Sequence, residues 1–418
     1  MVGSSHSGTA AEAIQPSPKS SQRLHYLDWL QVLAILGVFL FHAVHPFDDL
    51  ADWHIKNVEK SILATFFIGF FNLFGMPFFF LMAGATSWFS LQRRTTGRYV
   101  NERVTRLLIP FIIGALLLTP IQAYFELTHK GWWQGGSIVD FILSAEARTY
   151  YYTEYHSLTL GPEIFGLVGY HLWFVGFLFA FATIALPLFT WMNHDSGKRF
   201  VAKLVGFAKW RGGLLVFVIP IILIRIILQP FFPTYSGWSD FFFLLFFFIS
   251  GYILVADKRF TQAIRRDWLL YLILGVICTM FFFSVAAGVP VGDWMRSPST
   301  TMFYPSWTLH AINSWCWTMV IFYVGMRFLD YANKWLRYGR EASYPFFIFH
   351  QPVIIFIAFY AVQWEVDPLI KLLVVVIGSF TLLLMLYELL VRRINPVRAL
   401  FGMKPRRREE VKANKTIA

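Results

Sequence analysis

The stretch LDWLQVLAILGVFLFHAVHP, residues 27–46, decides the fold class of this chain. Its 20 residues are largely apolar, and a helix of that length rises about 30 Å, the thickness of the hydrocarbon core of a bilayer. Nine further segments are also apolar and long enough to cross a membrane. The ten expected membrane helices lie at about residues 27–46, 62–90, 107–126, 166–190, 213–229, 239–256, 268–288, 307–328, 344–363 and 369–391.

The composition of the whole chain agrees with this assignment. Apolar residues make up 57% of the 418 residues and charged residues 14%, against about 45–50% and 25% in typical soluble domains. A water-soluble fold of this size could not bury so much apolar surface. We therefore expect an all-α, polytopic integral membrane protein, with kinks where proline lies inside a segment, at Pro77, Pro187, Pro220 and Pro352.

The basic residues indicate the orientation. If the N-terminus is cytoplasmic, 29 of the 36 Lys and Arg residues fall in cytoplasmic segments and 5 in outside loops. Because cytoplasmic loops carry an excess of Lys and Arg, both termini are expected to be cytoplasmic. The chain then divides into a disordered tail at residues 1–22, a membrane domain at residues 23–395 and a basic cytoplasmic tail at residues 396–418.

The net charge of +12 does not indicate nucleic-acid binding, because the basic residues sit in short loops and not on a folded soluble module. Cys278 and Cys316 lie inside apolar runs and are interpreted as small core hydrophobes. The histidines are scattered over separate segments without the spacing of metal ligands, so no metal site is indicated.

Ionisable side chains inside a membrane segment are energetically costly, which makes them candidates for function. His42 lies near the outer end of the first segment, with His45 one turn later. Asp28 and Gln31 lie near its inner end. A neutral imidazole can take a proton from a hydroxyl nucleophile at ordinary pH, so His42 is a candidate general base. A structural hydrogen bond to a neighbouring helix would explain such a histidine equally well.

A second candidate is the sequence RVTRLLIPF, residues 103–111, at the cytoplasmic mouth of the third segment. Arg103 and Arg106 are three residues apart, which places both guanidinium groups on one face of a helix. Such a pair can clamp a phosphate group. Anchoring of the segment by the positive-inside rule is an equally good explanation.

Three further polar residues lie in apolar runs. His171 occurs in HLWF at the start of the fourth segment, His350 occurs in SYPFFIFHQPV in the ninth, and Arg225 is an isolated charge in the fifth. For each of them a structural hydrogen bond is the simpler explanation.

The longest outside loop, residues 127–165, is rich in aromatic residues. Aromatic rings beside polar groups suit the binding of sugars, but Trp and Tyr also gather at membrane interfaces, and we favour the interfacial interpretation. The residues concerned are Trp132, Trp133, Tyr150, Tyr151, Tyr152, Tyr155 and His156.

Five stretches, in this order along the chain, resemble the membrane acyltransferases of family three, in particular the branch that succinylates periplasmic glucans. They are YLDWLQVLAILGVFLFH (26–42), MPFFFLMAGATSW (76–88), RVTRLLIPF (103–111), HLWF (171–174) and SYPFFIFHQPV (343–353). Each stretch is short, and the resemblance is carried by their order and by their spread over nearly the whole chain.

The resemblance implies residue roles. The family's catalytic histidine corresponds to His42, and the paired arginines that contact the acyl donor correspond to Arg103 and Arg106. The family also has an arginine in its first helix, and Gln31 stands at that position, without the charge and the guanidinium fork. The possible supporting residues are Asp28, Gln31, His45, His171, Trp173 and His350.

The resemblance also implies an activity. We expect a bacterial inner-membrane enzyme that moves an acetyl or succinyl group from cytosolic acyl-CoA to a hydroxyl group of a glycan or another envelope acceptor. The donor would be a co-substrate, acetyl-CoA or succinyl-CoA, and no metal would take part. Membrane lipid is the expected surrounding, and the sequence does not reveal the oligomeric state.

Two other classes remain open from the sequence. A secondary transporter of a small polar or anionic solute also has about ten helices with buried histidines and broken helices. A structural or lipid-sensing membrane protein would leave the intramembrane ionisable groups without a purpose. Glycerolipid acyltransferases with a His-x-x-x-x-Asp motif do not fit, because Phe47 and Leu50 stand where His42 and His45 would need an aspartate.

Overall fold

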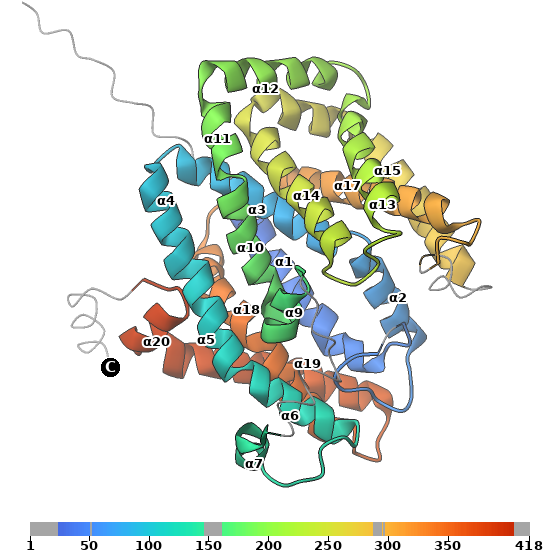
Figure 1. Ribbon diagram of the computed structural model, residues 1–418, viewed down its shortest axis with the longest axis vertical. Coiled ribbons are helices and arrows are strands. Elements are labelled where there is room, and N and C mark those ends of the chain that lie inside the picture. Colours follow the sequence, from blue (N-terminus) through green and yellow to red (C-terminus); the bar gives the residue numbers. More distant parts are fainter. Residues whose placement is uncertain (1–23, 51, 146–160, 287–294, 296, 405–418) are drawn as a thin grey trace, which may run out of the picture.

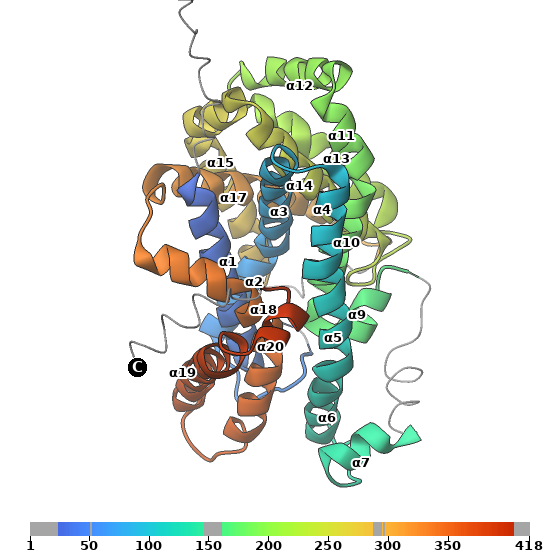
Figure 2. The same cartoon turned by 90° about the vertical axis from the view of Figure 1, so that its left-hand side faces the viewer.

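A computed structural model describes residues 24–50, 52–145, 161–286, 295 and 297–404 (Figures 1 and 2). These residues form helices joined by loops, and no strand occurs among them. The predicted all-α class is confirmed. The tail predicted at residues 1–22 and the loop aromatics Tyr150–His156 lie outside the described residues.

The N-terminal half of the described chain contains short and medium helices, several of them joined end to end. They are α1 (His25–Val44), η1 (His45–Phe47), α2 (Ile62–Asn72), α3 (Gly75–Leu91), α4 (Thr96–Arg103), η2 (Val104–Leu108), α5 (Ile109–Leu117), α6 (Thr119–His129), α7 (Ile138–Leu143), α9 (Ile164–Gly169), η4 (Tyr170–Leu172), α10 (Trp173–Ile184), α11 (Leu186–Asn193) and α12 (Asp195–Ala208).

The C-terminal half contains the longest helices. They are η5 (Gly213–Phe217), α13 (Val218–Leu228), α14 (Trp238–Ala256), α15 (Lys258–Ala286), α17 (Phe303–Phe328), α18 (Lys334–Ala361), α19 (Pro368–Met385), η6 (Leu386–Val391) and α20 (Asn395–Leu400).

Eight helical stretches of the described residues are long and apolar enough to cross a membrane. They are His25–Phe47, Ile62–Leu91, Thr96–His129, Ile164–Ile184, Trp238–Ala256, Lys258–Phe283, Lys334–Ala361 and Pro368–Val391. The other two predicted segments are also helical, but the apolar helix Gly213–Leu228 is short, and α17 carries polar residues such as His310 and Asn313. The multi-pass membrane character is confirmed, while the count of ten and the cytoplasmic termini stay predictions.

Three of the four prolines singled out in the sequence lie at helix starts. Pro77, Pro187 and Pro220 fall in the first turn of α3, α11 and α13, each directly after a break in the helical path. The missing N–H of proline has no cost there, because the first-turn N–H groups lack partners inside the helix. Pro352 differs, since it lies inside α18, which continues past it.

The centre of the bundle is the pair α3 and α14, which lie side by side (Figures 1 and 2). Two glycines allow their backbones to touch. A Cβ at Gly84 would lie 1.7 Å from the carbonyl oxygen of Phe248, and one at Gly251 would lie 1.8 Å from that of Leu81. Small residues at helix contacts are typical of membrane bundles, in which packing replaces the hydrophobic effect.

The remaining helices surround this pair. The line α4–η2–α5–α6 runs along one side of the molecule, and α1 packs against α3, α18 and α19 on another (Figure 2). The C-terminal helix α20 contacts α5 and η6. Between these layers the bundle encloses two cavities, one above the other along α3.

Candidate active site

Two cavities lie along the inner faces of α1, α3, α10 and α18. The larger, which we call the arginine cavity, has a volume of about 500 Å³ and is lined among others by Gln31, Arg103, Arg106, Arg340 and Arg398. The smaller, which we call the histidine cavity, has a volume of about 60 Å³ and is lined among others by His42, Asn72, His171, Trp173 and Tyr235. The structure therefore places both sequence candidates, the histidine and the arginine pair, on cavity walls.

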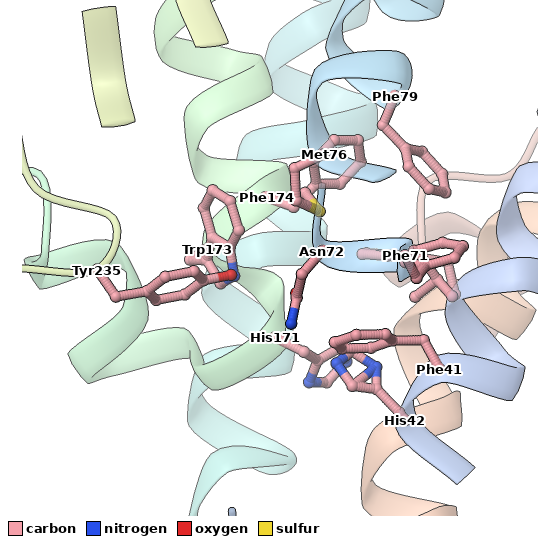
Figure 3. A pocket seen from close by; sticks show the side chains of 12 residues that line it. Phe41, His42, Phe71, Asn72, Met76, Phe79, His171, Trp173, Phe174 and Tyr235 are labelled. Carbon is pink, nitrogen blue, oxygen red and sulfur yellow. The ribbon is translucent and has the colours of Figure 1, made fainter. Parts of the chain in front are cut away.

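The histidine cavity is built where three distant parts of the chain meet. His42 lies near the end of α1, His171 in η4 and His350 in the middle of α18. The Nδ1 of His42 lies 2.9 Å from the Nε2 of His350. The ring of His171 stands edge-on to that of His350, with 5.0 Å between ring centres. Figure 3 shows His42 and His171 together at one end of the cavity, with the amide of Asn72 pointing toward them.

The proline inside α18 explains how His171 is held. Pro352 has no N–H, so the carbonyl of Ile348, four residues earlier, has no partner in the helix. The Nε2 of His171 donates to that carbonyl at 2.9 Å. The Nδ1 of the neutral ring then carries a lone pair, and it is buried without a hydrogen-bond partner among the described residues. His171 thus presents an unused acceptor at the cavity.

A similar argument assigns the protons of the other two histidines. The Nδ1 of His350 bonds to the carbonyl oxygen of Phe347. A carbonyl only accepts, so this Nδ1 carries the proton and the Nε2 of the neutral ring is an acceptor. His42 must therefore donate its Nδ1–H to His350. The Nε2 of His42 is left with a free lone pair, which is the state that a general base needs.

His45 lies next to this cluster but not on the cavity wall. It is buried, its ring stacks on Trp53 with 5.2 Å between ring centres, and its Nδ1 lies 2.5 Å from Asp48 Oδ2. Burial raises the pKa of the Asp48 carboxyl, but the hydrogen bond from His45 and the nearby Lys56 hold that pKa below its usual range. The sequence analysis named His45 among the possible supporting residues, and the structure places it outside the cavity lining, stacked on Trp53 and bonded to Asp48.

A buried polar network outside the cavity was missed in the sequence. Glu126 accepts hydrogen bonds from His54 at 2.7 Å and from Tyr170 at 2.8 Å, and it pairs with Lys130 at 3.0 Å. The Nε2 of His54 in turn lies 3.0 Å from the amide nitrogen of Gln351, next to His350. Glu126 is a charged residue at the end of a predicted membrane segment, which is the signal that would have found it.

The arginine pair lies where the helix changes its winding. Arg103 ends α4, and Arg106 lies in the π-helical turn η2. Such turns are rare and frequent at functional sites. Tyr99 donates to Ser87 at 3.1 Å, and Arg103 lies over the Tyr99 ring and 3.4 Å from Ser87 Oγ. The Nε of Arg103 is buried and has no hydrogen-bond partner among the described residues, so a donor is available on this wall.

Gln31 lines the arginine cavity, together with Asp28 one turn earlier on α1. The cation that stands near them comes from another helix, since Arg340 of α18 lies 3.2 Å from Asp28. Further into the C-terminal segment, Arg398 pairs with Glu341 at 3.2 Å and also lines the cavity. Gln31 carries no charge, but Arg340 and Arg398 from other helices place positive charge on the wall of the same cavity.

The structure also places Trp173 and Arg225, the two other candidates from the sequence. Trp173 lines the histidine cavity, and its ring contacts Tyr235 with 5.5 Å between ring centres. Arg225 lies on neither cavity wall. It is buried against Asp240 at 2.7 Å, Ser239 and Gln229. The structural explanation preferred for Arg225 agrees with these contacts.

Both cysteines are buried and not in a disulfide, in agreement with their interpretation as core residues.

The sequence of the chain matches a known protein family. A family model described as an acyltransferase domain matches residues 24–388. The chain belongs to acyltransferase family three. It is an acyltransferase, as the resemblance implied.

Curated relatives cover nearly the same length. The chain is 26% identical to glucans biosynthesis protein C of Salmonella schwarzengrund (strain CVM19633) over 423 residues, which is 95% of this chain and 98% of the relative. It is 25% identical, with the same coverage, to the protein of that name from Salmonella heidelberg (strain SL476). No solved structure matches the chain.

Proposed function

We propose that this acyltransferase moves an acetyl or succinyl group from cytosolic acyl-CoA to a hydroxyl group of a glucan on the outer side of a bacterial inner membrane. The name of the relatives, glucans biosynthesis protein C, supports the acceptor class. The excess of basic residues on one side supports the orientation. The single observation that carries the chemistry is the proton arrangement that leaves Nε2 of His42 as an acceptor beside a cavity.

The proposed reaction follows from that arrangement. Nε2 of His42 takes the proton of the acceptor hydroxyl while its oxygen attacks the thioester carbonyl. The C–S bond breaks as the O–acyl ester forms, and His42 returns the proton to the thiolate, which leaves as CoA-SH. The positive charge on His42 during the reaction is shared through Nδ1–H with His350 and the carbonyl of Phe347. The N–H of His171 is hydrogen-bonded to the backbone carbonyl of Ile348 and not to a second imidazole, so we assign the base to His42.

Three groups on the cavity wall suit the other requirements. The unused Nδ1 of His171 can accept a hydrogen bond from a sugar hydroxyl. The amide of Asn72 and the hydroxyl of Tyr235, which accepts a hydrogen bond from the indole N–H of Trp173, are donors on the same wall, where negative charge would develop on the carbonyl oxygen. The sequence reasoning named Trp173 but not Asn72, because an uncharged amide near a helix end gives no signal in the sequence.

The donor would be held in the arginine cavity. Arg103 and Arg106 face it, and Arg340 and Arg398 add positive charge from the C-terminal helices. Guanidinium groups bind phosphate oxygens through paired, charge-assisted hydrogen bonds. A CoA molecule carries phosphates at one end and the thioester at the other. The arrangement of the two cavities along α3 allows the phosphates to stay with the arginines while the acyl arm reaches toward His42.

The test is acyl transfer by the purified protein in lipid vesicles. Acetyl-CoA and succinyl-CoA with labelled acyl groups are supplied on one side and a glucan on the other. We expect label attached covalently to the glucan and released by mild alkali, as an ester is. Label that crosses the membrane without attachment, or that stays on CoA with every glucan and either donor, would contradict the proposal.

A further inference from the structure

The two cavities are separated by three aromatic rings. Of the described residues, only Phe79, Phe174 and Phe347 line both the arginine cavity and the histidine cavity. They come from three different helices, α3, α10 and α18. Figure 3 shows Phe79 and Phe174 on the side of the cavity away from His42. We call these three side chains the phenylalanine partition.

The rings of the partition pack against one another. Phe174 lies edge-on to Phe79 with 5.5 Å between ring centres, and edge-on to Phe347 with 5.4 Å. All three side chains are buried. Edge-to-face pairs at this distance are the favoured arrangement of aromatic rings. Phe174 thus links the other two rings into an apolar boundary between the cavities that holds no polar side-chain atom.

The partition also touches the histidines. The ring centre of Phe347 lies 5.3 Å from that of His350 and 6.0 Å from that of His171. The carbonyl of the same residue holds the Nδ1 proton of His350. Because the ring can turn about its side-chain bonds while the carbonyl stays in α18, the wall can open without releasing His350.

We propose that the phenylalanine partition is the acyl-selecting constriction of this enzyme. It passes the short acyl arm of the donor between the rings, and it keeps the phosphates and bulk water on the arginine side. The inference rests on the proposed direction of transfer, from the arginine cavity to His42.

Three features of the structure support this role. The arginine cavity, at about 500 Å³, is much larger than the histidine cavity, at about 60 Å³, so the space beyond the partition suits a small group. Among the described residues that line the two cavities, the arginines belong to the larger one and the histidines to the smaller. A dry wall at this point also protects the thioester, because water that reached His42 from the donor side would be activated in place of the acceptor hydroxyl.

The role predicts what smaller side chains would do. Phe174→Ala or Phe347→Ala would open a channel between the cavities. Longer acyl groups would then reach His42, and water would compete with the acceptor. Phe71 lines only the histidine cavity and Phe248 only the arginine cavity, so Phe71→Ala and Phe248→Ala are matched controls that remove a ring without joining the cavities.

The first test does not need catalysis. A cysteine is introduced as Asn72→Cys in the histidine cavity or as Thr86→Cys in the arginine cavity, and vesicles are treated on the face that carries Arg103 with 2-sulfonatoethyl methanethiosulfonate, a small anionic thiol reagent. The chain without an introduced cysteine measures the background from the buried Cys278 and Cys316. We expect rapid labelling of Thr86→Cys and slow labelling of Asn72→Cys. Adding Phe174→Ala should accelerate labelling of Asn72→Cys at least tenfold, whereas Phe248→Ala and Phe71→Ala should not.

The second test measures selectivity. Rates are compared for acetyl-, succinyl- and octanoyl-CoA, with and without a glucan. Phe174→Ala should raise the ratio of octanoyl to acetyl transfer at least tenfold and should raise hydrolysis of the donor without acceptor. Phe174→Leu and Phe347→Leu keep apolar packing and should give smaller changes in the same direction. These leucine variants still test the proposal if an alanine variant does not fold.

The outcomes separate the two proposals. Fast labelling of Asn72→Cys from the Arg103 face with all three rings intact, or no acceleration in any partition variant that folds, would overturn the partition. Absence of transfer with every donor would overturn the proposed function, while the labelling experiment would still decide whether the rings separate the cavities.

Discussion

The two cavities differ in how their residues are assembled. In the arginine cavity, Arg103 and Arg106 are neighbours on one stretch of chain. The histidine cavity depends on contacts between residues far apart in the sequence, such as His42 and His350, which are separated by 308 positions. The arginine pair is thus a local feature of one stretch of chain, whereas the histidine pair exists only because the bundle packs in one way. Substitutions in the arginine cavity should therefore change the affinity for the donor, and substitutions in the histidine cavity should change the rate of the chemical step.

The largest effect is expected in the histidine cavity. His42→Ala removes the proposed base, and general base catalysis contributes about 10²–10⁴-fold. We expect the rate of acyl transfer to fall by about 10³-fold while acyl-CoA binding changes little. His194→Ala, at an exposed histidine outside both cavities, is the matched control. Transfer at more than half of the original rate in a folded His42→Ala variant would remove this residue as the base.

The next effect belongs to the arginine cavity. Arg103→Ala with Arg106→Ala removes two guanidinium groups, and hydrogen bonds to charged groups contribute about 1.5–3 kcal/mol each. We expect the Kd for acyl-CoA, measured by calorimetry, to rise at least about 100-fold. Arg199→Ala with Arg211→Ala, two exposed arginines away from the cavity, controls for charge. Unchanged donor affinity would mean that the pair only anchors the helix.

A smaller effect should come from the partner of His42. His350→Phe removes the ring nitrogen that accepts from His42 Nδ1, and we expect kcat to fall about 30-fold, since a hydrogen bond to a charged group contributes about 1.5–3 kcal/mol. A purely structural role predicts no change in the pH profile, whereas loss of the acceptor should move the pH at which transfer is half-maximal. His350→Asn, which keeps an acceptor oxygen, should restore part of the rate; equal rates for both variants would contradict the positioning role.

The smallest effect is expected at the position where this chain departs from its family. Gln31→Arg adds one cation to the arginine cavity, where Arg340 already stands beside Asp28. The side chain of Gln31 is exposed, and ion pairs at exposed positions contribute about 1 kcal/mol or less. We expect acyl-CoA to bind about threefold more tightly, and we expect this gain in affinity to shrink at high salt. Gln31→Asn should leave the affinity unchanged. A hundredfold change in this affinity would contradict the exposed, weakly interacting placement of position 31 and would show a direct contact with the donor.

Much of the fold could be predicted because its causes are local. A segment such as residues 369–391 is apolar over its own length, and that alone requires a helix in a membrane. The π-turn at Val104–Leu108, the helix starts at the prolines and the close approach at Gly84 were not predicted, since each depends on neighbouring helices or on winding. Membrane helices pack through shape, and shape is not visible in an apolar pattern.

The sequence by itself determined the membrane surroundings, the helical class, the family and the two ionisable candidates, His42 and the arginine pair, because apolar length and ionisable residue types are properties of short stretches. Only the tertiary structure decided which groups meet. It placed His350 against His42, gave His171 the carbonyl freed by Pro352, and set three phenylalanines between the cavities. The reason is physical: a hydrogen bond between side chains exists only at about 3 Å, and helices from opposite ends of the chain come that close only after the whole bundle has packed.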